Sequence, residues 1–95
     1  MAEIMIFELA FCPYCRKARK ALRALAEENP AYAEIRVRWV AESRERALAD
    51  QYDYWYVPSV YQGSRKLYEA DPAEGYEEIR AGLRAALDQA MEGEA

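Results

Sequence analysis

Histidine is absent from the 95 residues of this chain, and cysteine occurs only twice. The missing histidine excludes catalysis by a serine-histidine or cysteine-histidine pair and every zinc site that uses an imidazole ligand. Two cysteines are also too few for a four-cysteine metal site within one chain or for a scaffold held by several disulfides. Whatever chemistry the two thiols perform must therefore come from the pair itself or involve ligands from a second chain.

Long apolar runs are missing as well, and glycine and proline are scarce, with four of each. This composition gives no reason to expect a disordered or fibrous protein. No apolar stretch approaches the roughly 18 residues that a transmembrane helix needs. Residues 1–10 lack the basic start and the small-residue cleavage site of a signal peptide. We therefore expect a single domain over residues 1–95, located in the cytoplasm and without a membrane partner.

The chain carries an excess of acid, with a formal charge of −4 and an isoelectric point near 4.9. A general nucleic-acid surface favours a strongly basic domain, so no nucleic-acid partner is expected. The charges are unevenly distributed along the sequence. Five basic residues and no acid occur between positions 16 and 23, whereas five acids and no base occur between 69 and 78. One region is therefore cationic and another anionic.

Apolar spacing predicts a strand, a helix and a second strand in the first part of the chain. The apolar run over 3–9 is typical of a buried strand, and the spacing over 13–28 is typical of a helix. Asn29 and Pro30 should end that helix. Apolar residues alternate with Arg36 and Arg38 over 33–40, which predicts a strand near the sheet edge with these arginines on its solvated face.

The second part of the chain predicts a short helix, a hairpin and a long final helix. The short helix should span 43–51, with Ala47, Leu48 and the following Tyr52 as its residues available for burial. The hairpin strands should span 59–62 and 65–69, on either side of a Gly-Ser turn. The final helix should open at Asp-Pro-x-Glu over 71–74, in which the aspartate is the N-cap. The order β-α-β-α-β-β-α predicts an α/β fold, a four-stranded mixed sheet flanked by three helices that cover both faces.

Both cysteines belong to the motif Phe-Cys-Pro-Tyr-Cys, where the first strand passes into the first helix. Positions i and i+3 of a helix face the same way, so Cys12 and Cys15 can form a disulfide that is easily made and broken. The free N–H groups of the helix start favour a thiolate at Cys12, and Pro13 sacrifices no needed donor there. Arg16 and Lys17 supply positive charge in the same turn. Cys15, deeper in the helix, should stay protonated until it resolves a mixed disulfide.

Other interpretations of the pair remain open. A structural disulfide would close too small a loop to stabilise the chain, and half of a zinc site would need two ligands from a second chain. Inert buried cysteines would leave Pro13 and the basic turn unexplained. Dithiol redox chemistry is the interpretation that uses every residue of the motif.

The motif Cys12-Pro13-Tyr14-Cys15, together with Val57-Pro58 further along, resembles the glutaredoxins of the thioredoxin superfamily. The resemblance covers about residues 3–88 and implies a thioredoxin-like fold. It implies that Cys12 is the nucleophile and Cys15 the resolving thiol, supported by the proline and tyrosine between them. It also implies that Pro58 follows a cis peptide bond and lies beside the disulfide. The backbone of Val57 would then pair with a substrate strand.

The same resemblance implies an enzyme, a thiol-disulfide oxidoreductase acting on protein disulfides or mixed disulfides. No bound cofactor or metal is expected, and the protein should be a monomer. Its reductant would be glutathione as cosubstrate or a flavoprotein similar to thioredoxin reductase. The alternative from another class is a binding module in which Cys12 of two chains shares a metal or an iron-sulfur cluster. A visible absorption spectrum separates the cluster from the dithiol.

Two departures from the family pattern concern glutathione. Glutaredoxins usually carry a basic or small polar residue shortly before the first cysteine, where this chain has Glu8 to Phe11. They also usually carry Gly-Gly followed by an aspartate pair after the hairpin, where this chain has Glu-Ala-Asp-Pro over 69–72. An acidic rim without glycines is a poor receptor for a tripeptide with two carboxylates.

Aromatic residues are concentrated at positions 52–56, immediately before Val57. Most of these rings should pack the loop against the sheet. Their number exceeds what a small core needs, so one or two should form an exposed rim near Cys12 that suits a protein partner, together with Phe11 and Tyr14.

Overall fold

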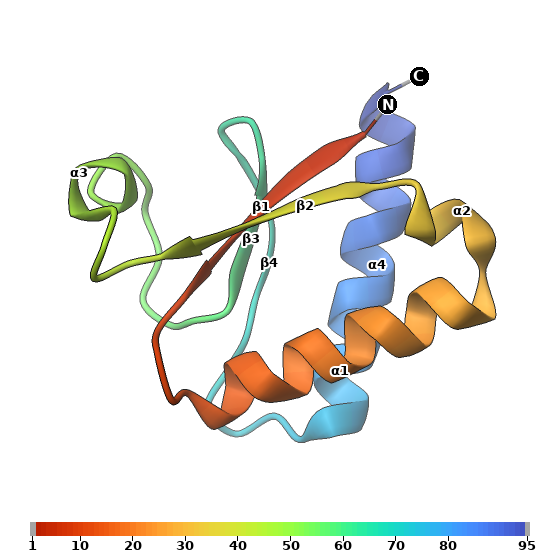
Figure 1. The fold of residues 1–95 in the computed structure, drawn as a ribbon, viewed down its shortest axis with the longest axis horizontal. Coiled ribbons are helices and arrows are strands. Elements are labelled where there is room, and N and C mark those ends of the chain that lie inside the picture. The colour runs from red at the N-terminus through yellow and green to blue at the C-terminus, as the bar shows by residue number, and fades with distance from the viewer. Residues whose placement is uncertain (1, 95) are drawn as a thin grey trace.

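The computed structural model describes residues 2–94 and contains one four-stranded sheet in the order β2-β1-β3-β4 (Figure 1). The strands are β1 (Glu3–Glu8), β2 (Arg36–Ala41), β3 (Ser59–Gln62) and β4 (Arg65–Glu69). Strand β1 pairs in parallel with β2 and antiparallel with β3, and β3 pairs antiparallel with β4. The predicted mixed sheet and both strands of the predicted hairpin are confirmed.

Residues 2–94 contain four helices instead of the predicted three: α1 (Pro13–Glu28), α2 (Pro30–Ala33), α3 (Arg46–Ala49) and α4 (Tyr76–Glu94). The additional helix is α2, and Asn29 explains it. This residue ends α1, as predicted, but its side-chain oxygen also accepts a hydrogen bond from the Ala31 N–H at 3.1 Å and caps the next helix. The strand predicted over 33–40 was therefore placed too early.

The short helix α3 covers only part of the predicted 43–51. Glu45 precedes it with a non-helical backbone (φ −122°, ψ 53°), and the chain before Glu45 forms a turn closed on the Ala41 carbonyl. The residue that α3 buries is Ala49, whereas Ala47 is exposed. The prediction that Ala47 is buried was wrong, because the helix begins later than its sequence pattern indicates.

The last helix also begins later than predicted. The expected reciprocal bonds exist: the Asp71 N–H donates to Glu74, and the Asp71 carboxylate accepts from the Ala73 N–H. They close a separate turn ahead of the helix. At the start of α4 only one bond of this kind is present, in which the Gly75 N–H donates to the Glu78 carboxylate at 2.8 Å.

Side chains pack on both faces of the sheet. On one face lie α1 and α4 (Figure 1), and this face holds the larger core. The other face is covered by α3 and the aromatic segment before β3, which enclose Phe7, Val40, Ala49 and Tyr61. Arg36 and Arg38 lie exposed on β2, at the sheet edge, and pair with Glu3 and Glu45. Among residues 2–94 no helix is long and apolar enough to cross a membrane.

Candidate active site around Cys12

Cys12 is the N-cap residue of α1, with an extended backbone (φ −82°, ψ 119°), and Pro13 occupies the first helical turn. The carbonyl of Cys12 accepts the N–H of Arg16 at 3.1 Å. The first turn contains no acidic residue, so the positive end of the helix is not neutralised from within α1. The placement of both residues at the strand-helix junction is as predicted.

The two thiols are free and differ in their surroundings. Cys12 is half-buried, whereas Cys15 is 3% exposed. Burial raises the pKa of the Cys15 thiol to about 12; a hydrogen bond with the Leu9 backbone opposes this rise, and the neighbouring Cys12 and Glu8 add to it. Cys15 therefore remains protonated at neutral pH, and Cys12 is the thiol that a disulfide in solution can reach.

Cys12 opens into a cleft of about 200 Å³. Three segments that are distant in sequence form its walls: the loop between β1 and α1, the segment before β3, and the turn after β4. The residues that line it are Leu9, Cys12, Tyr14, Trp55, Tyr56, Val57, Ala70, Asp71 and Pro72. The structure thus brings Cys12, Tyr14 and Val57 of the predicted site into one cleft. Residues 70–72 belong to the segment that the family resemblance placed at the rim of the site, and they form one wall of this cleft.

The Val57-Pro58 peptide bond is cis, as the family resemblance implied. Pro58 is buried, and its carbonyl accepts the Ala70 N–H at 3.0 Å. The backbone N–H and C=O of Val57 have no backbone hydrogen-bond partner within residues 2–94. Because Val57 also lines the cleft, these two groups can pair with an extended substrate chain.

Of the predicted supporting residues, Tyr14 lines the cleft, whereas Arg16 and Lys17 do not. The Tyr14 hydroxyl donates to the Pro72 carbonyl at 2.9 Å and ties the start of α1 to the opposite wall of the cleft. Arg16 is exposed, and the Lys17 amine lies 5.6 Å from the centre of the Tyr14 ring. Neither cation lines the cleft, so their influence on Cys12 can only be through the electrostatic field.

An apolar rim surrounds the cleft. The large apolar side chains that are exposed within residues 2–94 are Leu9 (42%), Phe11 (91%), Trp55 (86%) and Tyr56 (50%). All four belong to the segments that flank Cys12 or precede Val57. In contrast, the rings of Tyr52 and Tyr54 pack on Phe7 with centroids 5.0 and 4.9 Å apart. The predicted exposed rim is present at Trp55, Tyr56 and Phe11, whereas Tyr14, which was expected on the same surface, is half-buried and packs against the core.

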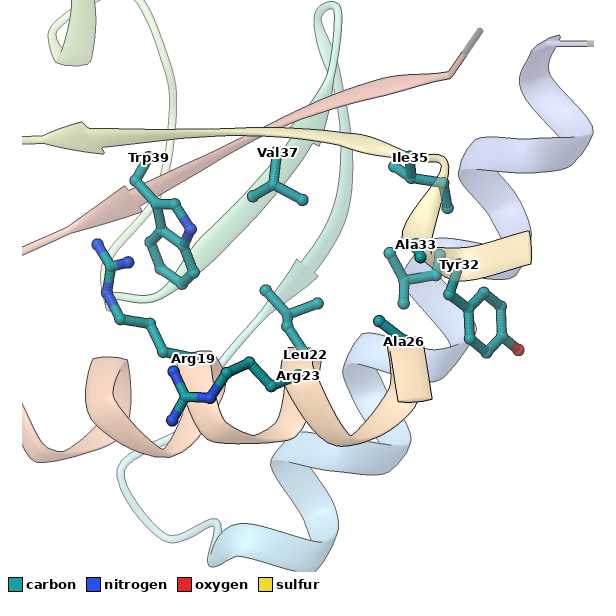
Figure 2. A pocket seen from close by; sticks show the side chains of 10 residues that line it. Arg19, Leu22, Arg23, Ala26, Tyr32, Ala33, Ile35, Val37 and Trp39 are labelled. Atoms are coloured by element: carbon teal, nitrogen blue, oxygen red, sulfur yellow. The ribbon is translucent and has the colours of Figure 1, made fainter. Parts of the chain in front are cut away.

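A second cavity of about 250 Å³ lies between α1 and β2 (Figure 2). Arg19 lines this cavity; its guanidinium carbon lies 4.0 Å from the centre of the Trp39 ring, and its guanidinium pairs with Glu8 at 2.8 Å. Neither thiol lines this cavity, so it is separate from the candidate active site. Among residues 2–94 no group of three or more metal-ligating side chains is assembled.

Comparisons with known proteins agree with this geometry. The family model Glutaredoxin matches residues 4–66. Among solved structures, a malarial protein superposes with a TM-score of 0.59 at 15% identity, covering 92% of this chain and 98% of its own. Trxlp from Edwardsiella tarda superposes with a TM-score of 0.59 at 17% identity, covering 85% of this chain and 80% of its own. A mutant thioredoxin from Halobacterium salinarum superposes with a TM-score of 0.57 at 16% identity, covering 90% of this chain and 74% of its own. These identities support the thioredoxin fold alone. The search of curated proteins found no significant match.

Proposed function

The chain belongs to the glutaredoxin family, and on that premise we propose that it reduces protein disulfides or mixed disulfides with Cys12 as nucleophile and Cys15 as resolving thiol. The observation that supports this assignment most directly is the contrast between the two thiols. Cys12 caps a helix and opens into a cleft, whereas Cys15 lies one turn further along and is 3% exposed.

In the first step the Cys12 thiolate attacks one sulfur of a substrate disulfide. A bond forms between Cys12 Sγ and that sulfur, the substrate S–S bond breaks, and the other sulfur leaves as a thiolate that takes a proton from solvent. The first turn of α1 contains no acidic residue that would oppose the negative charge of the attacking thiolate. Val57 would hold the substrate backbone during this step through its open N–H and C=O groups.

In the second step Cys15 loses its proton and attacks Cys12 Sγ. The mixed disulfide breaks, the second substrate sulfur leaves as a thiolate, and a Cys12–Cys15 disulfide forms. The substrate has gained two electrons and two protons; the protein has lost two electrons and the Cys15 proton, and the second proton came from solvent because Cys12 reacted as a thiolate. Two glutathione thiols or the dithiol of a flavoprotein reductase would return the two electrons. We propose the cytoplasm as the compartment, since a reducing pool is needed to keep the pair as thiols.

Single serine variants test the proposal. Reduced Cys15→Ser should attack a protein disulfide and stop at a covalent adduct on Cys12, detectable by mass spectrometry of proteolytic fragments, because the resolving thiol is missing. Cys12→Ser should form no adduct and reduce no disulfide. Retention of wild-type reductase activity by Cys12→Ser would show that the nucleophile is assigned wrongly.

The same variants distinguish the reductants. Glutathione can release a substrate from Cys12 without Cys15, so Cys15→Ser should keep glutathione-dependent turnover of mixed disulfides if glutathione is the reductant. If Cys15→Ser loses that turnover and a thioredoxin reductase rapidly reduces the oxidised wild type, the reductant is the flavoprotein. We propose a colourless monomer in both cases; a visible absorption band in a dimeric fraction would favour a shared cluster instead.

A further inference from the structure

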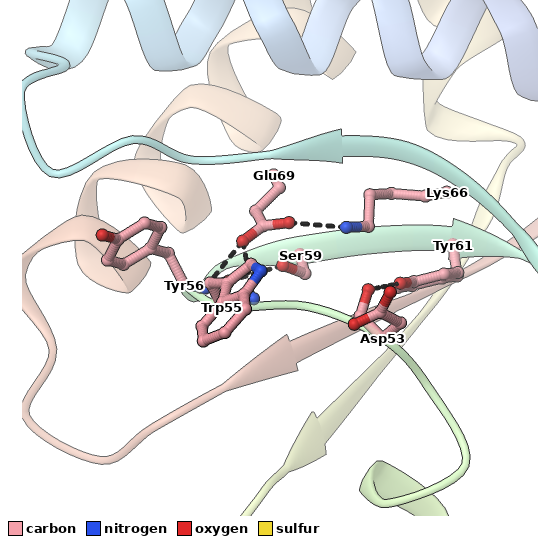
Figure 3. Close-up of polar contacts among 7 residues, drawn as sticks. All are labelled: Asp53, Trp55, Tyr56, Ser59, Tyr61, Lys66 and Glu69. Atoms are coloured by element: carbon pink, nitrogen blue, oxygen red, sulfur yellow. Dashed lines mark hydrogen bonds and ion pairs between the residues drawn. The ribbon is translucent and has the colours of Figure 1, made fainter.

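Glu69, the last residue of β4, binds the loop that forms one wall of the Cys12 cleft (Figure 3). One carboxylate oxygen, Oε2, accepts the backbone N–H groups of Trp55 at 2.8 Å and Tyr56 at 2.7 Å. The other oxygen, Oε1, accepts the Lys66 amine at 2.6 Å. The side chain of Glu69 is only 17% exposed. Its carboxylate therefore acts as a fixed acceptor for two consecutive backbone donors.

Side chains of β3 hold the remainder of this loop. The Ser59 hydroxyl donates to the Tyr56 carbonyl, and the Tyr61 hydroxyl donates to the Asp53 carbonyl (Figure 3). Within residues 2–94 the loop has no strand partner in the sheet, but side chains hold its backbone at Asp53, Trp55 and Tyr56. This arrangement positions two large aromatic side chains without burying them.

Trp55 and Tyr56 line the cleft of Cys12 next to Val57. The Trp55 side chain is 86% exposed, so almost none of its large apolar surface is removed from water in the free protein. An exposed indole on a backbone held by hydrogen bonds, in the same cleft as a nucleophile, can bury that surface only against a bound partner, and tryptophan residues in such positions contribute strongly to binding.

The charge of the cleft restricts what that partner can be. Among residues 2–94, Asp71 is the one charged residue that lines the cleft, and it disfavours a ligand with carboxylates close to its disulfide. Glutathione has two carboxylates, whereas the cysteine of a longer polypeptide can be flanked by apolar residues. The open backbone groups of Val57 favour the same occupant, an extended chain.

We propose that Glu69 is a positioning residue that fixes Trp55 beside Cys12, and that Trp55 selects disulfides on polypeptide segments with apolar residues next to the cysteine. The inference rests on the proposed function and specifies its substrate class. Trp55 and Val57 contact the substrate, whereas Glu69 acts through the loop.

The tether, that is, the two hydrogen bonds that the Glu69 carboxylate accepts from the Trp55 and Tyr56 N–H groups, persists over the physiological pH range. Burial raises the pKa of Glu69, but the Lys66 amine and the Tyr56 and Trp55 N–H groups outweigh burial and lower the pKa below its ordinary value. A carboxylate with a lowered pKa stabilises the fold above its unfolded-state pKa, near 4.5, and this contribution is lost as the pH falls through the lower folded-state value.

Two synthetic disulfide-linked peptides test the proposal, identical except for leucine or serine on both sides of the cysteine. The readout is the second-order rate constant of attack by the reduced protein, with hydroxyethyl disulfide as a third substrate. The wild type should attack the leucine peptide about tenfold faster than the serine peptide, and Trp55→Ala should bring this ratio close to one.

Variants of Glu69 distinguish the effect of its hydrogen bonds to the loop from the effect of its negative charge. Glu69→Gln keeps an oxygen that can accept both N–H groups and should retain most of the preference, whereas Glu69→Ala should lose most of it. Glu3→Ala, which removes a similar charge far from the loop, should leave all three rates unchanged. In a Trp39→Phe background Trp55 is the only tryptophan, and its fluorescence anisotropy should fall in Glu69→Ala but not in Glu69→Gln.

The outcomes distinguish this inference from the proposed function. Equal attack on both peptides by the wild type, or an unchanged preference in Trp55→Ala, would overturn the inference while the disulfide exchange remains. Glu69→Gln behaving like Glu69→Ala would overturn the role of the tether. Absence of reaction with all three disulfides would overturn the proposed function and this inference together.

Discussion

Cys12 and Cys15 lie one helical turn apart but in different surroundings, and this difference determines how each can act. Cys12 faces a cleft, whereas the Cys15 thiol is buried beneath the first turn of α1. Desolvation disfavours the charged form of a thiol, so burial keeps Cys15 protonated while a substrate is bound to Cys12. The intermediate should then last until Cys15 loses its proton.

Burial is the largest cause of the raised pKa of Cys15 and does not depend on the Cys12 thiol, so it predicts a pH dependence of the second step. Below its pKa the thiolate fraction of Cys15 increases tenfold for each pH unit. The rate of closure of the mixed disulfide should therefore rise about tenfold per unit between pH 7 and 9. The mixed disulfide can be formed in acid and its closure followed by stopped flow after a pH jump. A plateau near pH 8.5 would show that Cys15 titrates like an ordinary thiol.

Phe11 combines an exposed ring with a left-handed backbone (φ 61°). This conformation costs a residue with a Cβ atom roughly 1–2 kcal/mol, whereas glycine adopts it freely but loses more entropy on folding. Phe11→Gly should therefore exceed Phe11→Ala in unfolding free energy by about 1 kcal/mol. Urea denaturation of both variants measures this difference. Equal stability would mean that the loop relaxes without strain.

At the scale of elements, α4 packs closely against strand β4 at Gly82. A Cβ atom placed there would lie 2.2 Å from the ring of Tyr68 on β4. That ring cannot easily move, because its hydroxyl donates to Glu74 at 2.8 Å. The glycine that weakens the helical pattern in the sequence is therefore required by packing between α4 and β4.

Gly82→Ala should consequently destabilise the protein, although alanine favours a helix by about 1 kcal/mol. Overpacking should outweigh that gain, with a net loss of about 1–3 kcal/mol in thermal or urea unfolding. In a Tyr68→Ala background the clash is removed, and the same change at position 82 should stabilise the helix. A loss of equal size in both backgrounds would mean that the ring of Tyr68 is not the obstacle.

Apolar periodicity and the cysteine motif were sufficient to predict the sheet, the hairpin bounds and the helix that begins after Cys12. Capping residues misled the prediction at two boundaries, because the same local bonds can open a helix or close a turn. Asn29 does both, and Asp71 with Glu74 forms a turn where a helix start was expected. Glu69 could not be recognised from sequence, since its partners lie 13 and 14 residues away and meet it only after the hairpin forms.

At the scale of the whole molecule, most of the acidic stretch at 69–78 is occupied by internal bonds. Glu69 binds the aromatic loop, Glu74 accepts from Tyr68 and from the Asp71 N–H, and Glu78 accepts from the Gly75 N–H. Glu69, Glu74 and Glu78 are therefore held in place by internal hydrogen bonds, although their carboxylates keep their charge. Asp71 remains as the charge at the cleft, and it is this residue that should discriminate between charged and neutral disulfides.

Replacement of Asp71 should consequently change the selectivity of the cleft. Asp71→Asn keeps the oxygen that accepts the Ala73 N–H but removes the charge. It should raise the rate of attack on glutathione disulfide, relative to hydroxyethyl disulfide, by about two- to threefold at low ionic strength. The gain should diminish in about 1 M salt, where the Debye length shrinks to about 3 Å. Asp50→Asn, exposed after α3, makes the same change in net charge away from the cleft. An equal gain in that variant would assign the effect to net charge, and no gain in Asp71→Asn would show that the cleft does not repel carboxylates through Asp71.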